Sequence, residues 1–224
     1  MNDELYHFIN MLGDLGTVQR IAIYTLPVIF AITVHEAAHG YAAKFFGDMT
    51  AYKMGRISLN PARHIDPVGT VLVPALALLI GGMLFGWAKP VPVNFSRLRN
   101  PKKDMLWVAA AGPGVNLLMA ILWVLLIRFS VILPDSFALP AALMGAAGVM
   151  INTVLMVLNL LPLPPLDGGR IVVSLLPNRM AWQFAKIEPY GFFILLALML
   201  THVLDIILWP LLKVVLGLIS AIFL

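Results

Sequence analysis

The sequence predicts an all-α polytopic membrane protein, because few of its residues are charged and several long segments carry no charge at all. Of its 224 residues, 61% are hydrophobic and 12% are charged, whereas an average globular chain carries about 25% charged residues. No polar stretch is long enough for a soluble domain. We therefore expect a single integral-membrane domain over residues 1–224, whose activity belongs to the membrane core itself.

The first elements are a polar lead, a spanning helix and a basic loop. Residues 1–19 are expected to form a short lead at the membrane interface. The spanning helix is predicted from about Arg20 to Phe46, which is long enough to cross roughly 30 Å of hydrocarbon. Residues 44–67 are rich in basic residues and turn formers, and they carry weak signals for short strands at 52–54 and 57–59.

The next apolar segment, residues 68–86, contains Pro74 and Gly81-Gly82, which interrupt helices. We predict a re-entrant hairpin here, because it places the basic loops 44–66 and 87–104 on one membrane face. Together with Arg170, Arg179 and Lys186, 12 of the 15 Lys and Arg residues then lie on that face, which the positive-inside rule makes cytoplasmic. The alternative is that 68–86 crosses the membrane and separates the two loops.

Two further spanning helices are predicted at 105–127 and from about Leu139 to Leu161, both of them uncharged. A short helix is expected to open at Asp167 and to end before Pro177. Residues 189–224 are predicted to hold one spanning helix and a second helix that spans or lies in the interface.

The motif His35-Glu36-Ala37-Ala38-His39 lies in the first spanning helix. Two histidines four residues apart share one helix face, with Cβ atoms about 5–6 Å apart, and such a pair can bind one Zn²⁺. Glu36 lies around the helix, where it is placed to hold a water molecule. The alternative is two neutral histidines that donate to backbone carbonyls, but ionisable groups at membrane depth usually serve a function. The motif therefore predicts zinc and hydrolysis.

A catalytic zinc usually has three protein ligands and a water molecule, and this chain has no Cys. The candidate third ligands are His7, His64, Asp66, Asp167 and His202. Asp167 fits best, because with a re-entrant 68–86 segment it lies on the same side as His39. Its alternative role is an ordinary helix N-cap, and His64 with Asp66 is the rival pair.

Asn116 and Asn159 are amides within apolar helices, and both are candidates for positioning a substrate. Asn159 is the better candidate to hold a substrate carbonyl or its oxyanion. For either residue the alternative is a hydrogen bond to a neighbouring helix.

Three motifs together resemble the site-2 protease family of intramembrane zinc metalloproteases: His35 to His39, Gly112-Pro113-Gly114-Val115-Asn116, and the segment from Asn159 through Asp167 to Arg170. The resemblance covers about residues 20–178 and implies a three-helix catalytic core, formed by the helices that carry the His pair, Asn116 and Asn159. It implies that His35, His39 and Asp167 bind one zinc ion, that Glu36 is the catalytic acid/base, and that Asn159 positions substrate. Further segments, including Asn60-Pro61 and Gly86-Trp87, resemble a compact branch that lacks a PDZ or CBS domain.

We therefore expect a zinc endopeptidase of a prokaryotic cell membrane, which cleaves transmembrane segments of other proteins within the lipid bilayer on the cytoplasmic side. The chain shows no motif for nucleic-acid binding. A further hypothesis is that residues 50–60 hold an unwound substrate by edge pairing. One alternative function is a metal-ion transporter, although the His-Glu motif is not repeated in the chain. The other is an inactive membrane-binding relative, against which the intact Glu36 argues.

Overall fold

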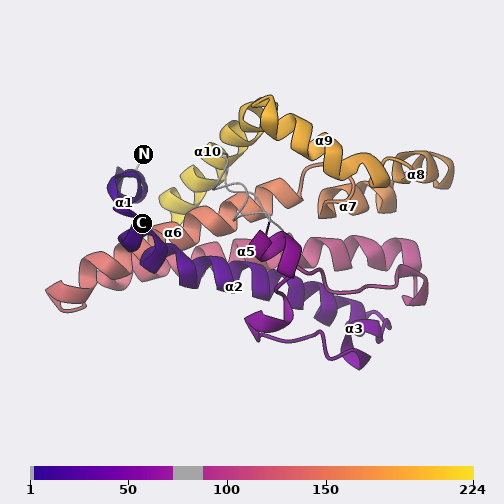
Figure 1. The fold of residues 1–224 in the computed structure, drawn as a ribbon, viewed down its shortest axis with the longest axis horizontal. Helices are drawn as coiled ribbons and strands as arrows, with labels where there is room; N and C mark the ends of the chain where they lie inside the picture. Colours follow the sequence, from indigo (N-terminus) through magenta and orange to yellow (C-terminus); the bar gives the residue numbers. More distant parts are fainter. Residues whose placement is uncertain (1–2, 73–87) are drawn as a thin grey trace.

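The computed structural model describes residues 3–72 and 88–224, and every regular element in these two ranges is a helix. Three long helices lie along the longest axis of the molecule: α2 (Thr17–Phe45), α5 (Pro101–Ser130) and α6 (Asp135–Asn159) (Figure 1). The last helix, α10 (Val203–Phe223), packs against α5 and α6.

In the described part of the chain, these four helices are each long and apolar enough to cross a membrane. The pair α8 (Asn178–Ala185) and α9 (Glu188–Leu200) is bent by 59° and makes a fifth candidate if it is taken as one span. The predicted all-α polytopic fold is thus confirmed. The protein is a multi-pass membrane protein.

Small residues let the central helices approach closely. A Cβ atom added to Gly148 of α6 would lie 2.3 Å from the Trp123 ring of α5, and one added to Gly145 would lie 2.7 Å from Ile127. Close backbone approach of this kind is how helices associate in lipid, where the hydrophobic effect contributes little between them. The interface between α5 and α6 is therefore tight, and it holds the two helices in register.

The N-terminal lead was predicted only as a short polar segment at the membrane interface. Residues Asp3–Asp14 of this segment form a helix, α1, that packs against α6. Leu5 and Leu12 are 0% and 3% exposed. They lie seven residues apart and so share one helix face. The apolar face of α1 belongs to the core of the bundle.

The predicted short strands at 52–54 and 57–59 are wrong. Residues Thr50–Lys53 form a helical turn, α3, and 57–59 pair with no strand among the residues described. At 52–54 the reason is Asp48, whose Oδ1 accepts hydrogen bonds from the backbone N–H of Thr50 at 2.9 Å and from its hydroxyl at 2.5 Å and so starts a helical turn. The suggested edge pairing of a substrate with residues 50–60 thereby loses its structural basis.

The three long helices lie where the sequence predicted them, with different ends, whereas α8 (Asn178–Ala185) was not predicted. The observed bounds are Thr17–Phe45, Pro101–Ser130 and Asp135–Asn159, against the predicted 20–46, 105–127 and 139–161. The short helix α7 (Asp167–Leu175) begins at Asp167 and ends before Pro177, as predicted. Three short helical turns lie in the loops: η1 (Pro61–Arg63), η2 (Pro67–Leu72) and η3 (Phe95–Arg97).

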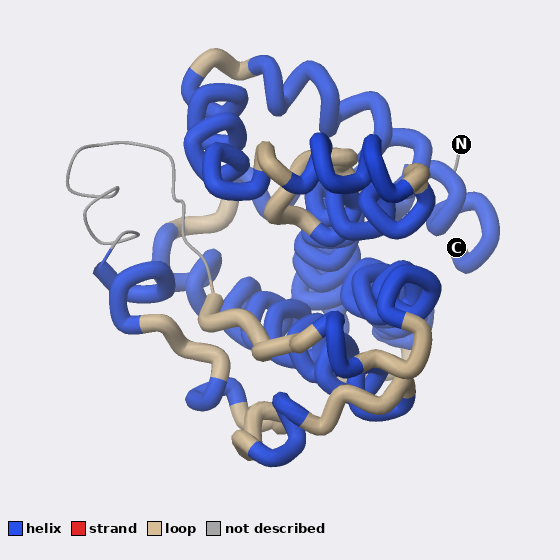
Figure 2. Tube along the Cα trace, turned by 90° about the vertical axis from the view of Figure 1, so that its right-hand side faces the viewer, coloured by secondary structure: helices blue, strands red, loops and turns tan. Residues whose placement is uncertain are grey.

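Loops and short helices gather at one end of the bundle, which faces the viewer in Figure 2. Here the two basic loops are hydrogen-bonded to each other: Lys89 N–H donates to His64 O at 2.9 Å, and Arg99 N–H donates to Phe46 O at 2.9 Å. The buried carboxylate of Asp48 also accepts a bond from Asn94 N–H at 2.7 Å. The loops at 44–66 and 88–104 therefore lie together, whereas the hairpin predicted at 68–86 falls mostly outside the described residues.

Candidate metal centre

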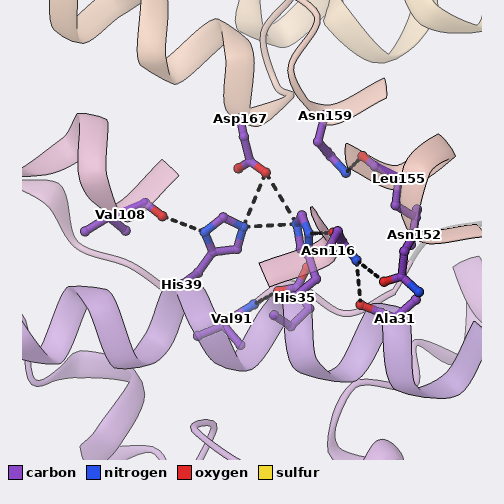
Figure 3. Close-up of polar contacts among 11 residues, drawn as sticks. Ala31, His35, His39, Val91, Val108, Asn116, Asn152, Leu155, Asn159 and Asp167 are labelled. Carbon is purple, nitrogen blue, oxygen red and sulfur yellow. Dashed lines mark hydrogen bonds and ion pairs between the residues drawn. The ribbon is translucent and has the colours of Figure 1, made fainter. Parts of the chain in front are cut away.

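The two histidines and Asp167 converge on one point (Figure 3). His35 and His39 stand one turn apart on α2, and their Nε2 atoms lie 3.1 Å from each other. Asp167 projects from the start of α7, so that its Oδ2 lies 3.3 Å from His35 Nε2 and 3.4 Å from His39 Nε2. Among the residues described, this is the only group of three or more potential metal-binding side chains whose ligand atoms meet in this way.

The arrangement fits a zinc ion. Ligand atoms at about 2.0–2.1 Å from a tetrahedral zinc lie about 3.3–3.4 Å from one another, close to the three distances found here. Asp167 Oδ2 is buried and has no hydrogen-bond partner, and a buried anionic oxygen without a partner is costly. A cation shared with the two imidazoles is the partner that this oxygen lacks.

Asp167 is charged at neutral pH. Burial alone would raise the pKa of its carboxyl, but the hydrogen bonds and positive charge that His35 and His39 supply when protonated outweigh burial and lower the pKa to about 2. The three side chains therefore offer one carboxylate and two imidazoles, a donor set that suits Zn²⁺.

Close backbone packing directs Asp167 toward α2. A Cβ atom on Gly168 would lie 2.3 Å from Leu160 O, and one on Gly169 would lie 2.5 Å from Pro164 N. These two glycines let the start of α7 fold back against the end of α6. The N-cap residue of α7 is Leu166 and no side chain caps the helix, so the Asp167 carboxylate points to the histidines instead.

The far end of α7 is tied to α5. The ammonium group of Lys102, in the first turn of α5, donates to Leu176 O and to Asn178 Oδ1, the latter at 2.9 Å. Cations are favourable at the carboxyl end of a helix. Both ends of α7 are therefore held, which fixes the direction in which Asp167 projects.

Each histidine uses its other ring nitrogen to hold its orientation. His39 Nδ1 donates to Val108 O of α5 at 2.7 Å, and His35 Nδ1 lies 2.5 Å from Asn116 Oδ1. An oxygen acceptor at Nδ1 places the proton there and leaves a lone pair on Nε2, which is the usual arrangement of a metal-binding histidine.

Glu36, the residue that follows His35, is held by the segment around Val91. Its Oε2 accepts a hydrogen bond from Val91 N–H at 2.7 Å. The extended segment around Val91 can lie this close because a Cβ atom on Gly40 would be only 2.9 Å from Ile57 and 3.2 Å from Val91. The carboxylate is thus adjacent to the histidines in sequence but outside the metal-binding group.

The other candidate ligands lie elsewhere. His64 is buried and its Nε2 donates to Ser58 O at 2.8 Å, while Asp66 accepts from the backbone N–H groups of Val68 and Gly69. His202 pairs with Asp205 at 3.0 Å, and His7 lies edge-on to Phe8 on α1. None of these four joins His35 and His39.

The amides divide into two environments. Asn116 is fully buried and hydrogen-bonded within the bundle, which favours a contact between helices over the predicted contact with substrate. Asn159 is half-buried at the end of α6, with its Nδ2 donating to Leu155 O at 2.9 Å. The partner of Asn116 is Asn152 of α6, a residue that sequence reasoning missed. The one sequence feature that could have indicated Asn152 is that, like Asn116 and Asn159, it is an amide within an apolar helix.

Gly112 of α5 forms a wall of the centre, and we expect Gly112→Ala to block it. The added Cβ would lie 2.5 Å from His39 Nε2 and 2.7 Å from His35 Nε2. Alanine is a better helix former than glycine by about 1 kcal/mol, so a loss of metal would be a steric effect. The measurement is zinc affinity, which should fall at least about tenfold.

The matched control is Gly114→Ala on the same helix, where an added Cβ meets nothing within 4 Å. It should retain the zinc affinity of the native protein. Equal affinities in the two variants would contradict the position assigned to Gly112.

Spanning helices that bring two histidines and an aspartate together define a metal-binding membrane protein, and comparison with known proteins gives its family. The family model described as "Peptidase family M50" matches residues 136–202, which include Asn159 and Asp167. "Putative zinc metalloprotease YwhC" of Bacillus subtilis (strain 168) is 39% identical over 206 residues, covering 88% of this chain and 91% of that protein.

Two relatives with the name "Putative zinc metalloprotease Rip2" are more distant. The protein from Mycolicibacterium smegmatis is 30% identical over 183 residues, covering 79% of this chain and 66% of its own length. The protein from Mycobacterium tuberculosis (strain H37Rv) is 29% identical over 196 residues, covering 84% and 73%. No solved structure matches the chain.

The chain belongs to peptidase family M50, the site-2 protease family, and is a zinc metalloprotease. This membership favours the protease over the metal-ion transporter considered from the sequence.

Proposed function

We propose that this metalloprotease is an endopeptidase that cleaves transmembrane segments of other proteins within the bilayer. The observation that carries the proposal is the convergence of His35, His39 and Asp167 beside helices long enough to span. His35 lies ten residues before the end of α2, which is about 15 Å along the helix. In a hydrocarbon core about 30 Å thick, that depth is within reach of a spanning substrate.

In this proposal the three side chains hold one zinc ion per chain. When bound, zinc polarises the carbonyl of the scissile bond and lowers the pKa of a water molecule to about 7. His39 Nδ1 is fixed by Val108 O and His35 Nδ1 by Asn116 Oδ1, so neither ring needs to turn when the metal binds.

Glu36 is the proposed acid/base. Its carboxylate takes the proton of the attacking water and delivers it to the leaving amide nitrogen. The hydrogen bond from Val91 N–H fixes Oε2 and leaves Oε1 for the proton. Asn159, half-buried at the end of α6 beside the segment that leads to Asp167, is proposed to position the substrate carbonyl.

A transmembrane substrate must unwind locally before a carbonyl can reach the centre, because its backbone groups are paired within the helix. The proposed function thus predicts cleavage in a segment that can leave the helical state. Glycine and proline weaken a helix for this reason.

The basic loops are proposed to face the cytoplasm, following the positive-inside rule. Single cysteines replacing Lys53 and Lys103, which are both exposed, should react with a membrane-impermeant reagent from the same side of a sealed vesicle. The native chain has no Cys to interfere. Reaction from opposite sides would overturn the shared orientation of the two loops.

The proposed function is tested with the purified chain in lipid vesicles that contain candidate single-span membrane proteins. We expect new termini within the spanning segment of a substrate, and we expect His39→Ala to lose both zinc and cleavage. The control is His7→Ala, which removes an exposed histidine of α1 and should change neither. One zinc per chain and full cleavage in the His39→Ala variant would refute the site.

A further inference from the structure

We propose that Asn152 of α6 is a positioning residue of the metal centre, which acts through Asn116 to place the proton of His35 on Nδ1. The inference rests on the proposed zinc site and concerns side chains that do not touch the metal. Four groups form a series of hydrogen bonds from the backbone of α6 across α5 to α2. Three of them, Asn152, Asn116 and His35, are seen in Figure 3.

The direction of this series of hydrogen bonds, from donor to acceptor, is set at Gly148. Asn152 Nδ2 donates to Gly148 O, one turn earlier on α6, at 2.8 Å. A backbone carbonyl can only accept, and it has a second lone pair available beside its helical hydrogen bond. The amide of Asn152 therefore has one orientation, with its Oδ1 turned away from α6 and toward α5.

Asn116 takes its orientation from this oxygen. Its Nδ2 donates to Asn152 Oδ1 at 2.9 Å and, at 3.3 Å, to Ala31 O of α2. Both hydrogens of the amide are used, and its Oδ1 faces His35 Nδ1 at 2.5 Å. Because this oxygen accepts, His35 carries its proton on Nδ1 and presents the Nε2 lone pair toward Asp167.

The side chains in this series of hydrogen bonds are buried. Asn116 and Asn152 are 0% exposed and His35 is 7% exposed, so water offers no substitute partner for a lost hydrogen bond. Without Asn152, the 3.3 Å contact with Ala31 O is the remaining anchor of the Asn116 amide. The amide can then turn over and present Nδ2 to His35, which favours the tautomer with a proton on Nε2, where it opposes metal binding.

Asn152→Leu tests this role, because leucine has a similar size and suits a spanning helix. We expect the zinc affinity, measured by competition with a chromophoric chelator, to fall about tenfold, the lower end of the range for partners of metal-binding histidines. The matched control is Thr153→Val. Thr153 is the next residue of α6, it is 1% exposed, and its hydroxyl has no hydrogen-bond partner, so its loss should leave zinc affinity unchanged.

A double-mutant cycle separates positioning from packing. If Asn152 acts through Asn116, then Asn152→Leu has no further effect on zinc affinity in a chain that already carries Asn116→Leu. A second readout is the ¹⁵N spectrum of the zinc-free protein with labelled histidine, with the His35 signals identified by their loss in His35→Ala. The native protein should show the Nδ1–H form of His35, and Asn152→Leu should show both tautomers.

The outcomes of these experiments distinguish failure of the proposed function from failure of the inference about Asn152. A native chain that binds no zinc would overturn the proposed function and this inference together. Native zinc binding that Asn152→Leu leaves unchanged would overturn the inference alone. So would additive losses in the double variant, or an unchanged His35 tautomer in Asn152→Leu.

Discussion

Replacing Glu36 with Gln is expected to abolish proteolysis while the protein keeps its zinc. Glutamine has nearly the same size, and its side-chain oxygen can still accept the hydrogen bond that Val91 N–H gives to Glu36 at 2.7 Å. It cannot take or deliver a proton. Since general acid–base catalysis contributes about 10²–10⁴-fold, cleavage should fall at least about 100-fold.

The measurements for Glu36→Gln are the cleavage rate in lipid vesicles and the zinc content of the same sample. Full zinc with no cleavage would assign Glu36 to proton transfer. Zinc lost together with activity would instead place Glu36 among the ligands, outside the group that the structure brings together. Turnover equal to that of the native chain would remove it from the mechanism.

Replacing Asp167 with Asn is expected to remove most of the zinc affinity and all of the activity. The substitution deletes a carboxylate whose Oδ2 lies 3.3 and 3.4 Å from the two histidine Nε2 atoms, and a neutral amide is a poor zinc ligand. The affinity should fall by more than the roughly 10–100-fold that follows loss of an outer partner.

The same substitution should cost the fold little. The N-cap residue of α7 is Leu166 and its start has no side-chain cap to lose, so what remains is the interaction of one negative charge with the helix dipole, worth about 0.3–1 kcal/mol. The helical circular dichroism and the elution volume of Asp167→Asn should therefore match those of the native protein. Full zinc and full activity would refute the ligand role and return His64 or Asp66 as candidates.

Local periodicity is the part of the site that the sequence predicts well. Two histidines four residues apart must share a face of any helix that contains them, so the relation between His35 and His39 needs no knowledge of the fold. The spans themselves follow from length and hydropathy, and α2, α5, α6 and α10 all lie in segments predicted from them. Asp167, which is distant from the histidines in sequence, was favoured by the predicted topology and then by the family resemblance.

Contacts made by the backbone are what the sequence could not predict. Val108 O, which orients His39, and Val91 N–H, which holds Glu36, belong to residues with unremarkable side chains. The wall formed by Gly112 also depends on how α5 rotates against α2. At residues 52–54, a weak strand propensity was outweighed by local contacts, the two hydrogen bonds from Thr50 to Asp48.

The bond from Val91 to Glu36 has a consequence for how this protein can vary. The donor is a peptide N–H, which nineteen of the twenty amino acids supply equally, so drift at position 91 leaves the contact intact as long as the new side chain fits against Gly40. Proline alone lacks the hydrogen. The neighbours on both sides, Pro90 and Pro92, already lack it, so one further substitution would leave three consecutive residues with no donor for the carboxylate. Alanine scanning would pass over this contact, because alanine at position 91 keeps the N–H. Position 91 should therefore tolerate residues of suitable size but not proline.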